Sequence, residues 1–99
     1  MILLYMKRGV GLDIVEFVKK AKEGDGDALV QLIMHKKDEY YKLAYVYLEN
    51  QEDALDALED MIVIIYEKLF WLRKNESFDS WSKVILVNCC KKILKSRKK

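Results

Sequence analysis

The sequence contains no proline and only four glycines among its 99 residues. Proline breaks helices and glycine weakens them, so their scarcity permits long helices and leaves room for few turns. The two cysteines, Cys89 and Cys90, are adjacent, and there is one histidine, His35. Neighbouring residues on a helix point about 100° apart, so these thiols cannot easily bridge each other. We therefore expect no zinc site, a surface histidine and two reduced thiols in a cytoplasmic protein.

Motifs for catalysis and cofactor binding are also missing. There is no Gly-rich phosphate loop, no Ser/His/Asp set and no cluster of metal ligands. The apolar start, residues 1–6, is too short for a signal peptide or a membrane span. We therefore expect neither an enzyme nor a cofactor nor a membrane segment, and we treat residues 1–12 as an N-terminal extension.

Regular apolar spacing is what the chain does have. Its residues are 52% hydrophobic and 34% charged, which suits a folded domain with one core. Apolar residues recur every three or four positions, which predicts an all-α bundle of about four helices within residues 13–99. Asp13 and Glu16 have capping-box spacing, which predicts the start of the first helix. Asn50 is suited to be the N-cap of the third helix. The expected helices cover about residues 13–23, 26–49, 51–72 and 78–97.

The third predicted helix is rich in acids. Between residues 49 and 67 there are seven acids and no base. Like charges three or four positions apart repel each other, and a basic partner would relieve that repulsion. The alternative is a core helix with a solvated acidic side, which the periodicity alone favours. At about 100° per residue, six of the acids gather away from the apolar side: Glu52, Asp53, Asp56, Glu59, Asp60 and Glu67.

The last predicted helix combines a tryptophan with bases. Its inward stripe is expected to contain Phe78 and Cys89, with Cys90 at the edge of the core. Lysines can contact phosphates, an asparagine can read a base edge and a tryptophan can stack on an unpaired base. The alternative is a core tryptophan beside an ordinary lysine-coated helix end. A neighbouring arc about 100° wide holds the remaining candidates: Trp81, Asn88, Lys91, Lys92, Lys95 and Lys99.

Four motifs, in order and at the right spacing, resemble bacterial sigma factors of the extracytoplasmic-function (ECF) type over about residues 21–97. Two lie upstream, Ala21-x2-Gly24-Asp25-x2-Ala28-x3-Leu32 and Ala44-Tyr45-x2-Leu48. The run from Asn50 to Asp56, with Glu59-Asp60 and Tyr66-Glu67-Lys68-Leu69, resembles the helix that binds core polymerase. Phe78-x-Ser80-Trp81-x3-Ile85-x2-Asn88 resembles the helix that melts and recognises the minus-ten element.

The resemblance implies a transcription initiation factor domain, the sigma factor region 2, that acts on promoters in the cytoplasm at the nucleoid. It would dock on the clamp helices of core RNA polymerase through Asp53, Asp56, Glu59 and Asp60. Residues 73–78 would form the loop that captures a base flipped from the non-template strand. Trp81 and Asn88 would work at the upstream edge of the melted minus-ten element. The implied DNA contacts are Arg73, Lys74, Asn75, Ser77, Phe78, Trp81, Asn88, Lys91, Lys92, Lys95 and Lys99.

The sequence departs from the family in composition and length. Glu59 stands where glutamine is usual, Ser82 where leucine is common, Leu86 where a small residue is usual, and Lys92 where an acid or small polar residue is frequent. No counterpart of the second domain (region 4), which reads the minus-thirty-five element, is present. We expect an excised domain or one half of a split factor, with an anti-sigma factor or a separate region 4 chain as a further partner. Two other functions stay open: a DNA-binding regulator without polymerase contact, and a helical protein-interaction module.

Overall fold

The computed structural model describes residues 13–97, so the extension expected over residues 1–12 and the candidate Lys99 lie outside the described residues. The all-α prediction is confirmed, and the described part of the chain contains no strand. Two short 3-10 turns lie between the last two helices. The elements are α2 (Ile14–Lys22), α3 (Gly26–Leu48), α4 (Gln51–Lys68), η2 (Leu69–Trp71), η3 (Asn75–Ser77) and α5 (Phe78–Arg97).

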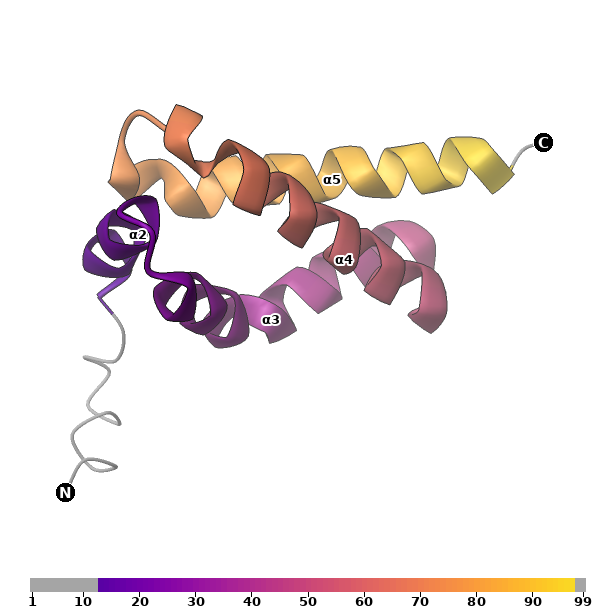
Figure 1. Cartoon of the computed structure of the whole chain (residues 1–99). Helices are drawn as coiled ribbons and strands as arrows, with labels where there is room; N and C mark the ends of the chain where they lie inside the picture. Colours follow the sequence, from indigo (N-terminus) through magenta and orange to yellow (C-terminus); the bar gives the residue numbers. More distant parts are fainter. Residues whose placement is uncertain (1–12, 98–99) are drawn as a thin grey trace, which may run out of the picture.

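The helices form a bundle in which α4 packs against both α3 and α5 (Figure 1). α5 runs along one side of the molecule and α3 lies on the other side of α4. The short α2 lies at one end, against α3, η3 and the start of α5. This arrangement brings the start of α5, the turns before it and α2 together at one end of the bundle.

Side-chain caps set the helix starts. The Asp13 carboxylate accepts a hydrogen bond from the Glu16 amide, and the Asn50 side chain accepts one from the Asp53 amide at 2.8 Å. Both caps were expected from the sequence. Gly24 has φ 100°, which lets the chain turn between α2 and α3. The helix expected over about residues 51–72 ends as an α-helix at Lys68, because the chain then tightens into η2.

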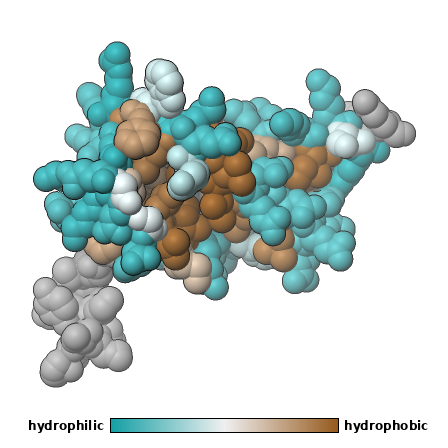
Figure 2. Space-filling view, viewed as in Figure 1, coloured by the Kyte–Doolittle hydropathy of each residue, from teal (hydrophilic) through white to brown (hydrophobic). Residues whose placement is uncertain are grey.

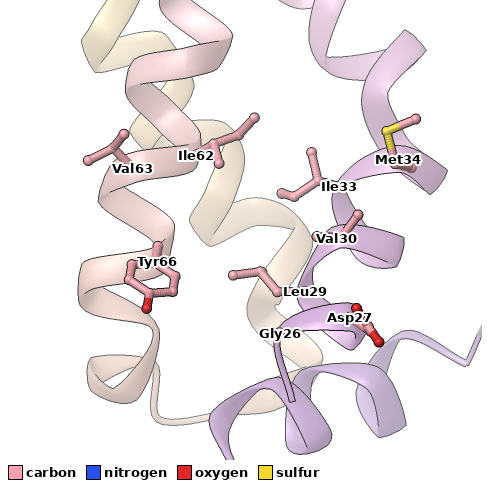
Figure 3. Close-up of a pocket in the computed structure, with 9 residues that line it drawn as sticks. All are labelled: Gly26, Asp27, Leu29, Val30, Ile33, Met34, Ile62, Val63 and Tyr66. Atoms are coloured by element: carbon pink, nitrogen blue, oxygen red, sulfur yellow. The ribbon is translucent and has the colours of Figure 1, made fainter. Parts of the chain in front are cut away.

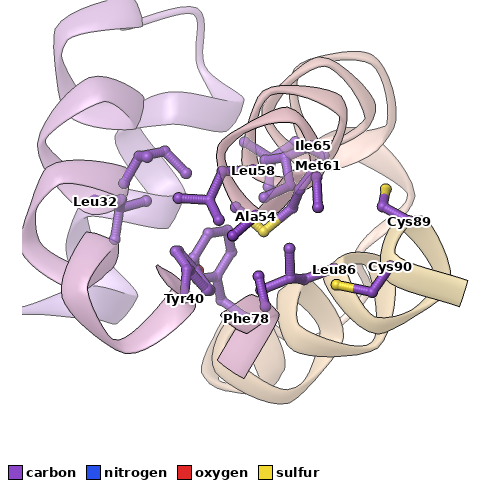
Figure 4. Close-up of a cluster of buried hydrophobic side chains, with 14 of the residues drawn as sticks. Leu32, Tyr40, Ala54, Leu58, Met61, Ile65, Phe78, Leu86, Cys89 and Cys90 are labelled. Atoms are coloured by element: carbon purple, nitrogen blue, oxygen red, sulfur yellow. The ribbon is translucent and has the colours of Figure 1, made fainter. Parts of the chain in front are cut away.

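The core lies where α3, α4 and α5 meet (Figure 4). Each large apolar side chain that becomes fully buried contributes about 1.5–3 kcal/mol. Cys90 is completely buried and Cys89 nearly so, and the expectation that Cys90 lies at the edge of the core is therefore wrong. The largest fully buried side chains come from all four helices and include Val18, Leu32, Tyr40, Leu48, Met61, Ile65, Phe78 and Leu86.

A buried hydrogen bond joins α3 to α5. The Tyr40 and Ser82 hydroxyls lie 2.7 Å apart, and both side chains are buried. Ser82 donates its own proton to the Asp79 carbonyl, so Tyr40 is the donor in the pair. Burial raises the pKa of Tyr40 to about 12, which keeps that proton in place. A leucine at position 82, as the family commonly has, would leave the Tyr40 hydroxyl without this partner.

A charged network beside that bond fixes the first turn of α5. Lys36 is only 6% exposed, and it pairs with Asp79 and, at 2.8 Å, with Glu39. Lys83 contacts the same two carboxylates at 3.2 Å and 3.4 Å. Burial lowers the pKa of Lys36, but its hydrogen bonds with Asp79 and Glu39 outweigh this and raise it above the ordinary value. Lys36 therefore stays charged and anchors the start of α5 to α3.

Candidate functional site

The acidic arc, which we define as Asp53, Asp56, Glu59 and Asp60, lies on the outer side of α4. Asp56, Glu59 and Asp60 are exposed and Asp53 is half-buried. The arc faces outward because the opposite side of α4 buries residues such as Leu58 and Met61. Among the residues that the structure describes, no ion pair involves Asp56, Glu59 or Asp60. Their charges are therefore available to a partner.

Asp53 differs from the rest of the arc because it has a partner within the chain. The Arg97 guanidinium donates to its carboxylate through Nη2 at 2.6 Å and through Nε at 3.1 Å. Nη2 also donates to the Leu48 carbonyl at 2.8 Å. Arg97 thus ties the end of α5 to the end of α3 and the start of α4. No sequence pattern indicated this contact, because Arg97 is 44 positions away from Asp53 along the chain.

Hydrogen bonds from α2 hold the predicted base-capturing loop in place. Lys22 donates hydrogen bonds to the Leu72 carbonyl and, at 2.7 Å, to the Asn75 side-chain oxygen. Arg73 and Lys74 are exposed on the loop, whereas Asn75 and Ser77 are half-buried. Phe78 is fully buried in the core. Its assignment as a DNA contact is therefore corrected: the Phe78 ring packs beneath the loop and cannot reach a nucleic acid in this structure.

The basic arc on α5, which we define as Asn88, Lys91, Lys92 and Lys95, is exposed as the sequence predicted. Asn88 and Lys91 lie together in a shallow groove along α5. The groove is also lined by four residues that were not among the predicted DNA contacts: Asp79, Lys83, Val84 and Val87.

Trp81 combines the two alternatives that the sequence left open. One side of its ring packs against the core and lies 6.1 Å, centroid to centroid, from the Phe78 ring in a tilted arrangement. The side chain is nevertheless only half-buried. Trp81 therefore contributes to packing and also presents part of its ring at the surface of α5.

An apolar groove between α3 and α4 was not predicted. Its volume is about 600 Å³, and side chains from the first half of α3 face side chains from the second half of α4 across it (Figure 3). The space-filling view shows hydrophobic side chains gathered over these two helices (Figure 2). Val30, Met34, Val63 and Tyr66 line it and are all more than half exposed. Little in the sequence indicated this groove. Its lining residues adjoin the core stripe of each helix, so in the sequence they look like part of the core.

The described part of the chain contains neither a metal-binding cluster nor a membrane-spanning helix. No group of three or more His, Cys, Asp or Glu side chains within residues 13–97 is arranged to hold a metal ion. Within the same residues, no helix combines the length and the apolar character needed to cross a membrane.

Two curated proteins are similar to this chain. It is 34% identical over 80 residues to the RNA polymerase sigma factor SigV of Bacillus subtilis, covering 81% of this chain and 48% of SigV. It is 30% identical over 71 residues to the ECF RNA polymerase sigma factor SigW of the same organism, covering 72% of this chain and 38% of SigW. The chain thus spans less than half the length of either relative. No protein-family model and no solved structure matches it. The two relatives confirm the resemblance to ECF sigma factors, and the all-α structure agrees with it.

Proposed function

We propose that this chain, a relative of the ECF sigma factors, is the part of a transcription initiation factor that binds core RNA polymerase and contacts the minus-ten promoter element. The observation that carries the proposal is the acidic arc. It lies at the positions that resemble the polymerase-binding motif, and three of its four carboxylates are exposed without an ion pair among the described residues. Unpaired like charges on one helix face are stabilised by a basic surface.

For docking, the four acids have two different roles in this proposal. Asp56, Glu59 and Asp60 face outward and would contact basic side chains of the polymerase clamp helices. Asp53 is already held by Arg97 at 2.6 Å. It would act chiefly by fixing the start of α4, and would contribute less to direct contact than the other three.

For DNA, the loop and α5 supply complementary contacts. The exposed Arg73, Lys74, Lys91 and Lys95 suit phosphates, which gives binding that depends on salt and is blind to sequence. The exposed Asn88 and the half-exposed Trp81 suit base edges and base faces, which are accessible where the duplex is open. We therefore expect the chain to prefer a minus-ten segment with unpaired bases over a duplex of the same length.

The test of docking is capture of purified core RNA polymerase on the immobilised chain. Asp56→Arg and Asp60→Arg should each abolish capture, because like charges at a close interface pair cost several kcal/mol. Asp38→Arg is the matched control, since Asp38 is an exposed acid on α3 outside the acidic arc. All variants should keep the wild-type helical content. Wild-type capture by both α4 variants would contradict the docking surface.

The test of DNA binding is a salt series on duplex and bubble-containing DNA. Lys91→Ala and Lys95→Ala should weaken binding to both forms and reduce the salt slope by about one unit each. Trp81→Ala should selectively weaken binding to the bubble. If the chain binds both DNA forms equally, its proposed role in contacting melted promoter DNA is wrong.

A further inference from the structure

Trp71 is the most exposed large hydrophobic residue in the described part of the chain, with 78% of its surface accessible. No motif in the sequence indicated a role for this residue. A tryptophan with this exposure presents both the edge and a face of a large indole ring to solvent. Tryptophan is enriched at interfaces because its ring combines a large apolar face with a polar N–H group.

The backbone around Trp71 is held in place. η2 begins at Leu69 and is followed by Leu72. The side chains of these two leucines are 3% and 5% exposed and anchor the turn in the core. The Leu72 amide donates to the Leu69 carbonyl at 3.0 Å, and Lys22 donates to the Leu72 carbonyl. The indole is therefore carried on a fixed turn. A backbone turn that is already fixed loses little conformational freedom when a planar group stacks on the ring that it carries.

Basic residues lie on both sides of Trp71 in the sequence. Lys68, Arg73 and Lys74 lie within three residues of it, and all three are exposed. No ion pair in the described part of the chain involves any of them. An exposed indole flanked by free cations fits a polyanion that also carries planar groups. Single-stranded nucleic acid has both properties, whereas a duplex hides its base faces.

We propose that Trp71 is a stacking site for an unpaired base, with Arg73 and Lys74 contacting the adjacent phosphates. This inference rests on the proposed function, because it extends the single-strand path from the base-capturing loop onto η2. Phe70, the neighbouring exposed aromatic residue, lines a separate hollow with Gly24 and Tyr66. It therefore belongs to the α2–α3 side of the molecule and is not part of this stacking site.

The test uses the fact that the chain has only two tryptophans, Trp71 and Trp81. Trp81→Phe isolates the emission of Trp71, and Trp71→Phe isolates that of Trp81. The probe is a twelve-nucleotide thymidine oligonucleotide, titrated into the full chain at low salt. The emission of Trp71 should be quenched as the oligonucleotide binds, because a stacked base contacts the indole face. A duplex of the same length should leave that emission nearly unchanged.

Affinity for the same oligonucleotide gives the second measurement. Trp71→Ala should weaken binding about 5- to 150-fold, as expected for the loss of one stacked base. Trp71→Phe should retain most of the affinity, and both variants should melt at the wild-type temperature because the side chain is exposed. The salt slope should not change, since no cation is removed.

Several results would overturn the inference. The first is wild-type oligonucleotide binding by Trp71→Ala, and the second is an absence of oligonucleotide binding by any form of the chain. A third is weaker capture of core polymerase by Trp71→Ala with unchanged oligonucleotide binding, which would make Trp71 a protein contact. Polymerase capture by the acidic-arc variants is measured without DNA, so failure of the docking proposal is distinguishable from failure of this one.

Discussion

The Arg97 guanidinium lies 2.6 Å from the Asp53 carboxylate and joins the last turn of α5 to the first turn of α4. These two helices carry the proposed DNA-binding and polymerase-binding surfaces. The same guanidinium nitrogen also reaches the Leu48 carbonyl at the end of α3. Three helix ends therefore meet at one side chain, which fixes the basic arc relative to the acidic arc.

A double-mutant cycle on this pair should show coupling. Both side chains are partly exposed, so each single alanine variant should lose only about 1 kcal/mol or less of unfolding free energy. Arg97→Ala should also speed amide hydrogen exchange in the last turn of α5, because that turn loses its anchor. Asp53→Ala should produce a similar change in the same amides. If the two substitutions have additive effects on stability and exchange, the contact does not couple the helices.

The Tyr40–Ser82 hydrogen bond gives a second prediction. Tyr40→Phe should lower the unfolding free energy by about 0.5–1.5 kcal/mol. Ser82→Ala should cost about 1–3 kcal/mol, because it leaves the buried Tyr40 hydroxyl unpaired. The double variant should lose less unfolding free energy than the sum of the losses in the two single variants, as measured by urea unfolding. A double variant that loses the full sum would mean that the two hydroxyls act independently.

Because of the Lys36–Asp79 pair, the free energy of unfolding should depend on pH at acidic pH. Burial favours the neutral form of Asp79, but hydrogen bonds with Lys36 and Lys83 outweigh it and lower the carboxyl pKa. The contribution of Asp79 is therefore complete above its unfolded-state pKa of about 3.9. It is lost as the pH falls through the lower folded-state value.

Asp79→Asn should remove that contribution and leave a variant whose stability falls less between pH 5 and pH 2 than that of the wild type. The measurement is urea unfolding at intervals across this range. Asp38→Asn, at an exposed position outside every ion pair of the described residues, is the control and should follow the wild type. An Asp79→Asn curve parallel to the wild-type curve would refute the pair's role.

The two thiols should be inert in the folded chain. Burial raises the pKa of Cys89, and it raises that of Cys90 to about 11, so both are protonated at neutral pH. A thiol reagent at pH 7.5 should label neither residue until denaturant is added, and should then label both. Cys89→Ala/Cys90→Ala should be less stable but should still bind DNA and core polymerase. Rapid labelling of the folded chain would show that α5 packs differently.

Local signals were enough to predict the helices and their caps. Asp13 and Asn50 cap the helices because their side chains reach amides three residues away, a relationship visible in the sequence. The outward position of Asp56 follows equally from the helical period. What the sequence did not show depends on contacts between distant residues. Tyr40 lies in a polar stretch of α3, and the hydrogen-bond partner of its buried hydroxyl is Ser82, which is 42 positions away.

The exposure of Trp71 also depends on distant contacts. An apolar run such as Leu69–Trp71 normally continues a core stripe. Here the chain tightens into a 3-10 turn that buries Leu69 and Leu72 and turns Trp71 outward. The assignment of Phe78 to DNA failed for the converse reason: the motif resemblance gave its position along the chain but not its burial beneath the loop.

The most direct test of the proposed function is the affinity of core RNA polymerase for a fluorescent minus-ten bubble, measured with and without this chain. We predict that the wild-type chain raises that affinity, because the acidic arc holds it on the polymerase while the loop and α5 contact the open DNA. Asp56→Arg should give no increase, and Asp38→Arg should act like the wild type. An unchanged affinity with the wild-type chain, or an equal increase with Asp56→Arg, would contradict the proposal.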